Sequence, residues 1–156
     1  KNIGTYLHKS FLKRYRGYKH LNIISSKILA FFGKLLIKIS PSFKIPKYIN
    51  NGIILDYGSG SGDMVSFLKH IGWDAEGIEF NSHAAQVGQD SALKIIHGSI
   101  EALECKNEYY DVVIIAVDHS IFYSMGISDI RKFGKEEAII FDVKSIFPIK
   151  DSDSRL

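Results

Sequence analysis

The sequence contains few of the residues that build metal and disulfide sites. Cys105 is the single cysteine in 156 residues, which excludes an internal disulfide and fits a reducing compartment. One thiol cannot build a structural zinc site, and no pair of the six histidines has convincing metal-ligand spacing. A nucleophile elbow, a P-loop lysine and an EF-hand loop are also missing. We therefore expect a protein without a metal centre.

Acidic residues are missing from the first part of the chain. Residues 1–47 contain eleven Lys or Arg and no Asp or Glu, although the whole chain carries 17 acidic residues and a formal net charge of +3. The remainder is therefore net acidic, and its apolar content is sufficient for one core. This contrast predicts a basic helical leader over residues 1–47, followed by a single domain over residues 48–156.

An amphipathic helix is predicted over residues 21–39 of the leader, because apolar residues recur there at three- and four-residue steps. They are Leu21, Ile24, Ile28, Phe31, Leu35 and Ile39. Lysines interrupt this stretch too often for it to span a bilayer. Two interpretations stay open: a helix packed over the sheet or cleft, or peripheral contact with an anionic membrane surface. We expect a cytoplasmic protein, membrane-associated under the second interpretation; no recognised motif supports nucleic acid as a partner.

The segment Ile53 to Asp63, IILDYGSGSGD, predicts a strand that leads into a nucleotide-binding turn. Gly58, Gly60 and Gly62 permit positive φ and close approach of a ligand to the backbone. Strands are expected at 53–57, 75–79, 94–97, 111–117 and 138–143, with helices near 62–70, 82–90 and 128–133. This alternation predicts an α/β fold: a Rossmann-like parallel sheet of order 3-2-1-4-5 with helices on both faces.

Acidic residues around the glycines indicate which nucleotide the turn would bind. Position 63 is Asp, where the dinucleotide fingerprint requires glycine, and a pyrophosphate would be repelled there. Asp56 closes the strand, and Glu79 ends the next apolar segment, where an acid can hold ribose hydroxyls. Three carboxylates suit a cationic nucleoside without phosphate, so the pattern favours S-adenosylmethionine over NAD.

The stretch over residues 48–117 resembles the class I S-adenosylmethionine-dependent methyltransferases. The resemblance is carried by LDYGSGSGD, GWDAEGIEFN, IIHGSIEAL and YYDVVIIAV followed by DH. It implies that the glycine loop and Asp56 contact the methionine part of the cofactor, that Glu79 holds the ribose, and that Ser99 lies where the family usually has an Asp for the adenine amine. The implied cofactor-binding residues are Asp56, Gly58, Ser59, Gly60, Gly62, Glu79, Phe80 and Ser99.

The last part of the chain, over residues 111–156, resembles the end of the UDP-sugar dehydrogenases, with DVVIIAVDHSIF, IIFDVKSIFP and DSRL. In that family the segment belongs to a Rossmann-like nucleotide-sugar-binding domain. The chain thus combines two patterns that meet near Val117. A class I enzyme normally continues into a last antiparallel pair of strands, and we expect this chain to lack it.

His119 is the candidate catalytic residue, because related methyltransferases place an acid and a histidine after the fourth strand. It would act as a general base toward an acceptor hydroxyl, or would only cap the next turn. The sequence therefore predicts a methyltransferase for a small molecule, of sugar or lipid-linked type, in polysaccharide biosynthesis. Two alternatives stay open: a nucleotide-sugar-binding module, or a truncated cofactor-binding protein without activity. The oligomeric state is not indicated.

Overall fold

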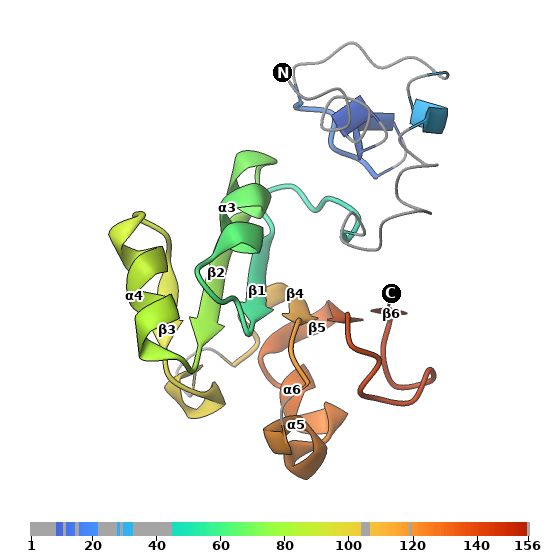
Figure 1. The fold of residues 1–156 in the computed structure, drawn as a ribbon. Helices are drawn as coiled ribbons and strands as arrows, with labels where there is room; N and C mark the ends of the chain where they lie inside the picture. The colour runs from blue at the N-terminus through green and yellow to red at the C-terminus, as the bar shows by residue number, and fades with distance from the viewer. Residues whose placement is uncertain are drawn as a thin grey trace. The chain divides into compact units, whose positions relative to one another are not determined.

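The computed structural model describes residues 9–10, 12–14, 16–21, 28, 30–32, 45–103, 107–118 and 120–155. The chain divides into two compact units, Lys1–Ile49 and Asn50–Leu156. The strands described here all belong to the second unit, in which strands and helices alternate along the chain (Figure 1).

The second unit is built on a six-stranded sheet of order β3-β2-β1-β4-β5-β6 in which every neighbouring pair is parallel. The strands are β1 (Ile53–Tyr57), β2 (Asp74–Glu79), β3 (Ile95–His97), β4 (Tyr110–Ile115), β5 (Gly134–Asp142) and β6 (Ser154–Arg155). The helices are α3 (Asp63–His70), α4 (Ser82–Asp90), the 3-10 helix η2 (Ile100–Leu103), α5 (Ser120–Met125) and α6 (Ile127–Arg131).

The predicted order of five strands is confirmed, and the structure adds three elements to the prediction. The 3-10 helix η2 follows β3, the short helix α5 precedes α6, and β6 pairs in parallel with the far edge of β5. The usual antiparallel pair is not formed by the residues described after β5. The sheet therefore ends in a parallel strand of two residues.

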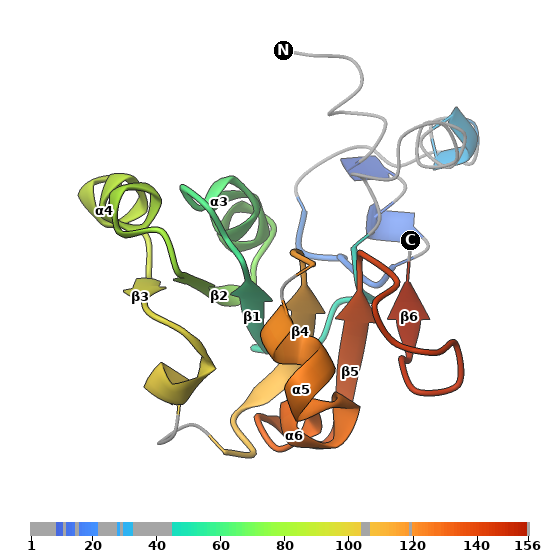
Figure 2. The same cartoon turned by 60° about the horizontal axis from the view of Figure 1, so that its bottom comes forward.

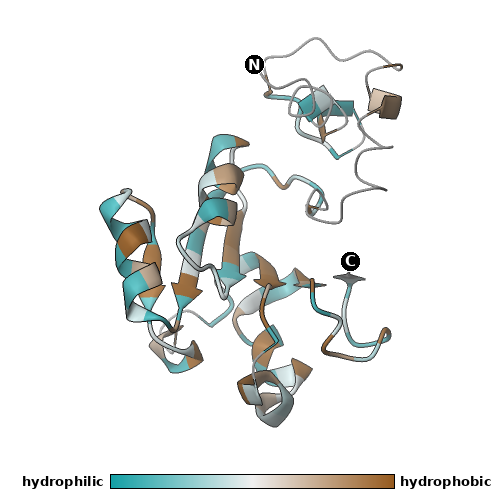
Figure 3. Cartoon of the chain, in the orientation of Figure 1, coloured by the Kyte–Doolittle hydropathy of each residue, from teal (hydrophilic) through white to brown (hydrophobic). Residues whose placement is uncertain are grey.

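Helices cover both faces of the sheet, as the alternation predicts. Figure 2 shows α3 and α4 on one side of the strands and α5 and α6 on the other. Leu55 of β1 pairs with Val113 of β4, and both belong to the buried cluster that includes Phe122 of α5 and Ile130 of α6. In Figure 3, β4 in the middle of the sheet is largely hydrophobic, because a central strand of a parallel sheet is buried on both of its faces.

One carboxylate ties three strands together at their amino ends. Asp111 Oδ2 accepts a hydrogen bond from the backbone N–H of Ile53 at 2.8 Å. The amino group of Lys135 lies 2.8 Å from the same oxygen. Asp111 therefore connects β1, β4 and β5 where the sheet begins, opposite the edge at which the glycine loop lies.

The first unit has a small core of its own around Tyr18, which is completely buried. The Tyr18 hydroxyl donates to the Pro46 carbonyl at 3.0 Å, and the Tyr48 N–H donates to the Arg16 carbonyl at 2.8 Å. Of the helix predicted over residues 21–39, residues 28 and 30–32 are described and are helical, whereas Leu21 lies in a bend, so the predicted start is wrong. The remaining residues lie outside the described part of the chain. Within the described chain, no helix is long and apolar enough to cross a membrane.

Asp153 is expected to hold β6 in place, because its carboxylate accepts from the Ile140 N–H at 2.8 Å and from Arg131 at 3.1 Å. Asp153→Ala should lower the free energy of unfolding by about 1–2 kcal/mol, since it leaves the Ile140 N–H unpaired. Urea denaturation measures this loss. Asp151→Ala is the matched control, because Asp151 contacts Arg131 through its backbone carbonyl; equal losses in both variants would contradict the assignment.

Candidate functional site

The glycine loop turns sharply at the carboxyl end of β1. Gly58, Gly60 and Gly62 have φ values of 83°, 56° and 89°, a region that favours glycine. The backbone N–H groups of Gly58 and Ser59 donate to the Ile78 carbonyl at 2.9 and 3.1 Å, which fastens the loop to β2. Gly62 then forms the N-cap of α3. The predicted strand, turn and helix are all present.

The three glycines are required for different reasons. A Cβ atom on Gly58 would lie 2.4 Å from Cγ1 of Val117, and one on Gly62 would lie 2.6 Å from Cδ1 of Leu93. At both glycines, side chains of the protein occupy the space that a methyl group would need. A Cβ atom on Gly60 would meet nothing within 4 Å, so this part of the loop presents bare backbone to open space.

Glu79 is held in place by two backbone donors. Its Oε2 accepts from the N–H of Gly60 and its Oε1 accepts from the N–H of Asn81, each at 2.8 Å. The carboxylate thus joins the glycine loop, the end of β2 and the residue that caps α4. Each oxygen keeps a lone pair for a further donor, such as a ribose hydroxyl.

Asp56 is a buried carboxyl group, with 2% of its surface exposed. Its Oδ1 has no hydrogen-bond partner within the part of the chain that the structure describes. Burial, and secondly the nearby charge of Glu79, raise the pKa of Asp56 from 3.8 to about 7. A cation bound beside these two acids would favour the ionised form of Asp56, so the pair fits a positively charged ligand.

A cavity of about 380 Å³ lies beside Glu79 at the carboxyl edge of the sheet. Open α/β sheets bind their ligands at this edge. Side chains and backbone from β1, from β2 and from the segments after β2, β3 and β4 line it. They are Tyr57, Gly58, Ile78, Glu79, Phe80, Asn81, Ser99, Val117 and Ile121. The structure thereby brings four residues of the predicted cofactor site to one cavity: Gly58, Glu79, Phe80 and Ser99.

Phe80 and Ser99 give this cavity an aromatic surface and a polar one. Phe80 is 69% exposed although it is a large apolar side chain, so its ring contributes an apolar surface to the cavity. The Ser99 hydroxyl donates to the Glu101 carboxylate. Because its hydrogen is engaged, the Ser99 oxygen is left as an acceptor for an amine.

The other predicted residues lie apart from the cavity surface. Asp56 lies behind the loop, and Gly60 touches the site through its bond to Glu79. Ser59 faces β2 instead: a Cβ atom on Gly77 would lie 2.4 Å from Ser59 Oγ. Candidate catalytic residue His119 lies outside the described residues. Sequence reasoning missed the cavity residues Tyr57, Ile78, Asn81, Val117 and Ile121, which are ordinary core or cap residues in sequence.

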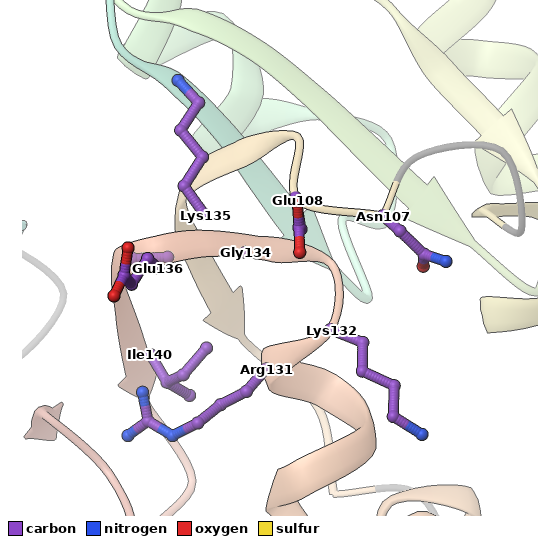
Figure 4. A pocket seen from close by; sticks show the side chains of 9 residues that line it. Asn107, Glu108, Arg131, Lys132, Gly134, Lys135, Glu136 and Ile140 are labelled. Carbon is purple, nitrogen blue, oxygen red and sulfur yellow. The ribbon is translucent and has the colours of Figure 1, made fainter.

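A larger cavity, of about 570 Å³, lies at the amino edge of the sheet and does not form a convergent site. Figure 4 shows that the amino groups of Lys132 and Lys135 point away from each other. Each cation there already has a carboxylate partner: Arg131 pairs with Asp153, Lys132 with Asp129, and Lys135 with Asp111. Among the described residues no cluster could hold a metal ion, either here or at the carboxyl edge.

Several solved structures similar to this chain are S-adenosylmethionine-dependent methyltransferases. An S-adenosylmethionine-dependent methyltransferase from Archaeoglobus fulgidus has a TM-score of 0.56 at 20% identity, over 74% of this chain and 57% of that one. One from Methanosarcina mazei has a TM-score of 0.52 at 21% identity, over 60% and 52%. The fold is that of the class I methyltransferases. This chain spans little more than half of those two proteins, and at such identities the likeness concerns the fold alone.

A third similar structure, a TehB-like S-adenosylmethionine-dependent methyltransferase from Corynebacterium glutamicum, covers 92% of this chain and 77% of its own, with a TM-score of 0.53 and 12% identity. No protein-family model matches the chain.

Sequence similarity of another kind covers a smaller segment. The UDP-N-acetyl-D-glucosamine 6-dehydrogenase of Salmonella typhi is 43% identical over 60 residues, which are 38% of this chain and 14% of that enzyme. The Pseudomonas aeruginosa enzyme is 47% identical over 47 residues, 30% of this chain and 11% of its own. These matches confirm the predicted resemblance of a small segment to the dehydrogenases.

Alanine substitution at two glycines of the loop should distinguish a position that is closely packed from one that faces open space. Gly58→Ala should lower the free energy of unfolding by about 2–4 kcal/mol, because the methyl group overlaps Val117 and φ is positive. Gly60→Ala meets open space and should cost only about 1 kcal/mol, for the left-handed backbone. Urea denaturation of both variants tests this loop geometry. Equal losses in the free energy of unfolding would contradict it.

The raised pKa of Asp56 predicts a pH-dependent stability for the protein without ligand. The unfolded chain ionises Asp56 near pH 3.8 but the folded chain only near pH 7, so the contribution of Asp56 to stability is lost as the pH rises through this window. Asp56→Asn removes the charge, and should stabilise the protein on the order of 4 kcal/mol more at pH 8 than at pH 4. Thermal unfolding at both pH values measures this difference; an equal effect at both would refute the raised pKa.

Proposed function

We propose that this chain is an S-adenosylmethionine-dependent methyltransferase domain that acts on a small molecule. The observation that supports this most is the carboxylate of Glu79, fixed by the N–H groups of Gly60 and Asn81 at the mouth of the cavity. A fixed carboxylate at the end of the second strand suits a ribose diol, since both oxygens can accept a further hydrogen bond.

The charge of the site favours a cationic nucleoside. Asp56 and Glu79 lie close enough for the charge of Glu79 to raise the pKa of Asp56, and the buried Asp56 Oδ1 has no hydrogen-bond partner in the described chain. An ammonium group would supply both a donor and a positive charge for these acids. A diphosphate would instead add negative charge beside two carboxylates, at a cost that a low local dielectric increases.

The adenine end of the cofactor is assigned to Phe80 and Ser99. The exposed Phe80 ring offers a face for stacking, and the Ser99 oxygen can accept from the exocyclic amine because its own hydrogen is given to Glu101. Glu101 thereby orients the serine that replaces the usual acid. The carboxylate of Glu101 attracts the same amine as well, so the pair carries the charge that a single Asp supplies in the family.

When bound, the cofactor would supply an electrophilic methyl group on its sulfonium sulfur. The residues of this chain contribute alignment: they hold the ribose and adenine, and leave the acceptor to approach the methyl group in line. In the transfer, the acceptor would take the methyl group from the sulfonium sulfur, which would leave as a neutral thioether, and the acceptor would lose a proton. For an acceptor hydroxyl we assign that proton to His119, as the sequence predicts.

The acceptor is proposed to be a sugar or a lipid-linked sugar. The support is the segment similar to UDP-N-acetyl-D-glucosamine 6-dehydrogenases, enzymes that are named for a nucleotide sugar. The same segment supports the second candidate function, a nucleotide-sugar-binding module without methyl transfer. The buried Asp56 beside Glu79 disfavours this candidate, because a nucleotide sugar carries a diphosphate.

Calorimetric titration distinguishes the two candidates. S-adenosylhomocysteine and S-adenosylmethionine should bind the full chain with micromolar affinity, and UDP-N-acetylglucosamine should not. Glu79→Gln should weaken binding by about tenfold or more, since an amide cannot accept from both backbone N–H groups and the ribose.

Asp90→Asn is the matched control, because Asp90 is an exposed acid on α4 away from the cavity. This variant should bind as the original protein does. Binding of the nucleotide sugar alone would reject the methyltransferase proposal, and an equal loss in both variants would reject the role of Glu79.

A further inference from the structure

Three apolar side chains of the first unit are turned toward solvent on one helical stripe. Ile28, Phe31 and Phe32 are 69%, 62% and 47% exposed. Their spacing of three and four residues places them on the same face of a helix. Ala30, in the same turn, is completely buried, so the exposed stripe is the outer face of this helix.

An outer face with this composition is unusual for a helix in water. The outer face of a helix in a globular protein is normally polar, and adjacent exposed large apolar residues mark a surface that meets another apolar phase. The Phe31 and Phe32 rings pack edge to face with centroids 6.0 Å apart, so they form one continuous aromatic surface. The core of the first unit is supplied by other residues, including Leu12, Tyr18 and Ile45.

The positive charge of the first unit indicates what kind of apolar surface the exposed stripe would meet. Residues 1–47 contain eleven Lys or Arg without a single acid, whereas nine basic and all 17 acidic residues follow. Exposed cations among the described residues of the first unit include Arg14, Lys19 and Lys47. Basic residues near a membrane surface are attracted by anionic headgroups, each by about 1 kcal/mol, while apolar side chains enter the acyl boundary.

We propose that Ile28, Phe31 and Phe32 form a membrane-docking surface for anionic phospholipid. The surface lies outside the cavity described above and does not depend on the methyltransferase proposal. It would bring the second unit of the chain to the surface of a bilayer. Two independent features carry it, the outward apolar stripe and the absence of acids from the same unit.

Sedimentation of the full chain with lipid vesicles tests this surface. The protein should sediment with vesicles containing phosphatidylglycerol and not with pure phosphatidylcholine. Release is expected in about 1 M NaCl, where the screening length is about 3 Å. Ile28→Ser should weaken binding by about tenfold, the effect of removing one buried isoleucine, and Phe31→Ser should do the same.

Ile149→Ser is the matched control, because Ile149 is a 78% exposed isoleucine of the second unit. It should bind vesicles as the original chain does, and thermal unfolding checks that all variants fold. Absence of binding by the folded original chain, or equal binding by Ile28→Ser and Ile149→Ser, would overturn the proposal. A dimer that Ile28→Ser dissociates, without vesicle binding, would instead assign the stripe to contact between two copies.

Discussion

The hydrogen bond from the Gly60 N–H to the Glu79 carboxylate is the contact on which the carboxyl edge of the sheet depends. Because Glu79 also accepts from Asn81, one side chain fixes the loop after β1 against the start of α4. The loop N–H groups of Gly58 and Ser59 bond to Ile78 in the same region. The cavity therefore has a shape that the protein builds from its own contacts, before any ligand contributes.

This arrangement has an electrostatic cost, which falls on Asp56. A carboxyl group that is 2% exposed and close to Glu79 is stable in its protonated form, or in the presence of a positive charge. Buried groups of this kind are common where a protein gives up stability to bind a ligand. The same two acids thus make the site more favourable for a cationic ligand than for an anionic one.

The sequence predicts the elements whose apolar pattern is regular. β1 and α4 have the predicted bounds, because a β-branched run and a capped helix leave little choice. β5 starts earlier than predicted, at Gly134, since its first residues include the exposed Lys135, Glu136 and Glu137 and carry no strand pattern.

Short elements gave no sequence signal: α5 has six residues and β6 has two, too few for any period to show. At the site, residue types with special chemistry, such as Glu79 and Gly58, were predictable. Val117 and Ile121 were not, because their place at the cavity follows from tertiary packing.

The position of β4 in the sheet has a further consequence. It pairs with β1 on one side and β5 on the other, so three strands lie on one side of it and two on the other. The hydrogen bonds between strands join backbone groups and do not depend on side-chain identity. Alternate residues along each strand point to the same face of the sheet. A change of sequence on either side of β4 would therefore leave the hydrogen-bond ladders to β1 and β5 intact.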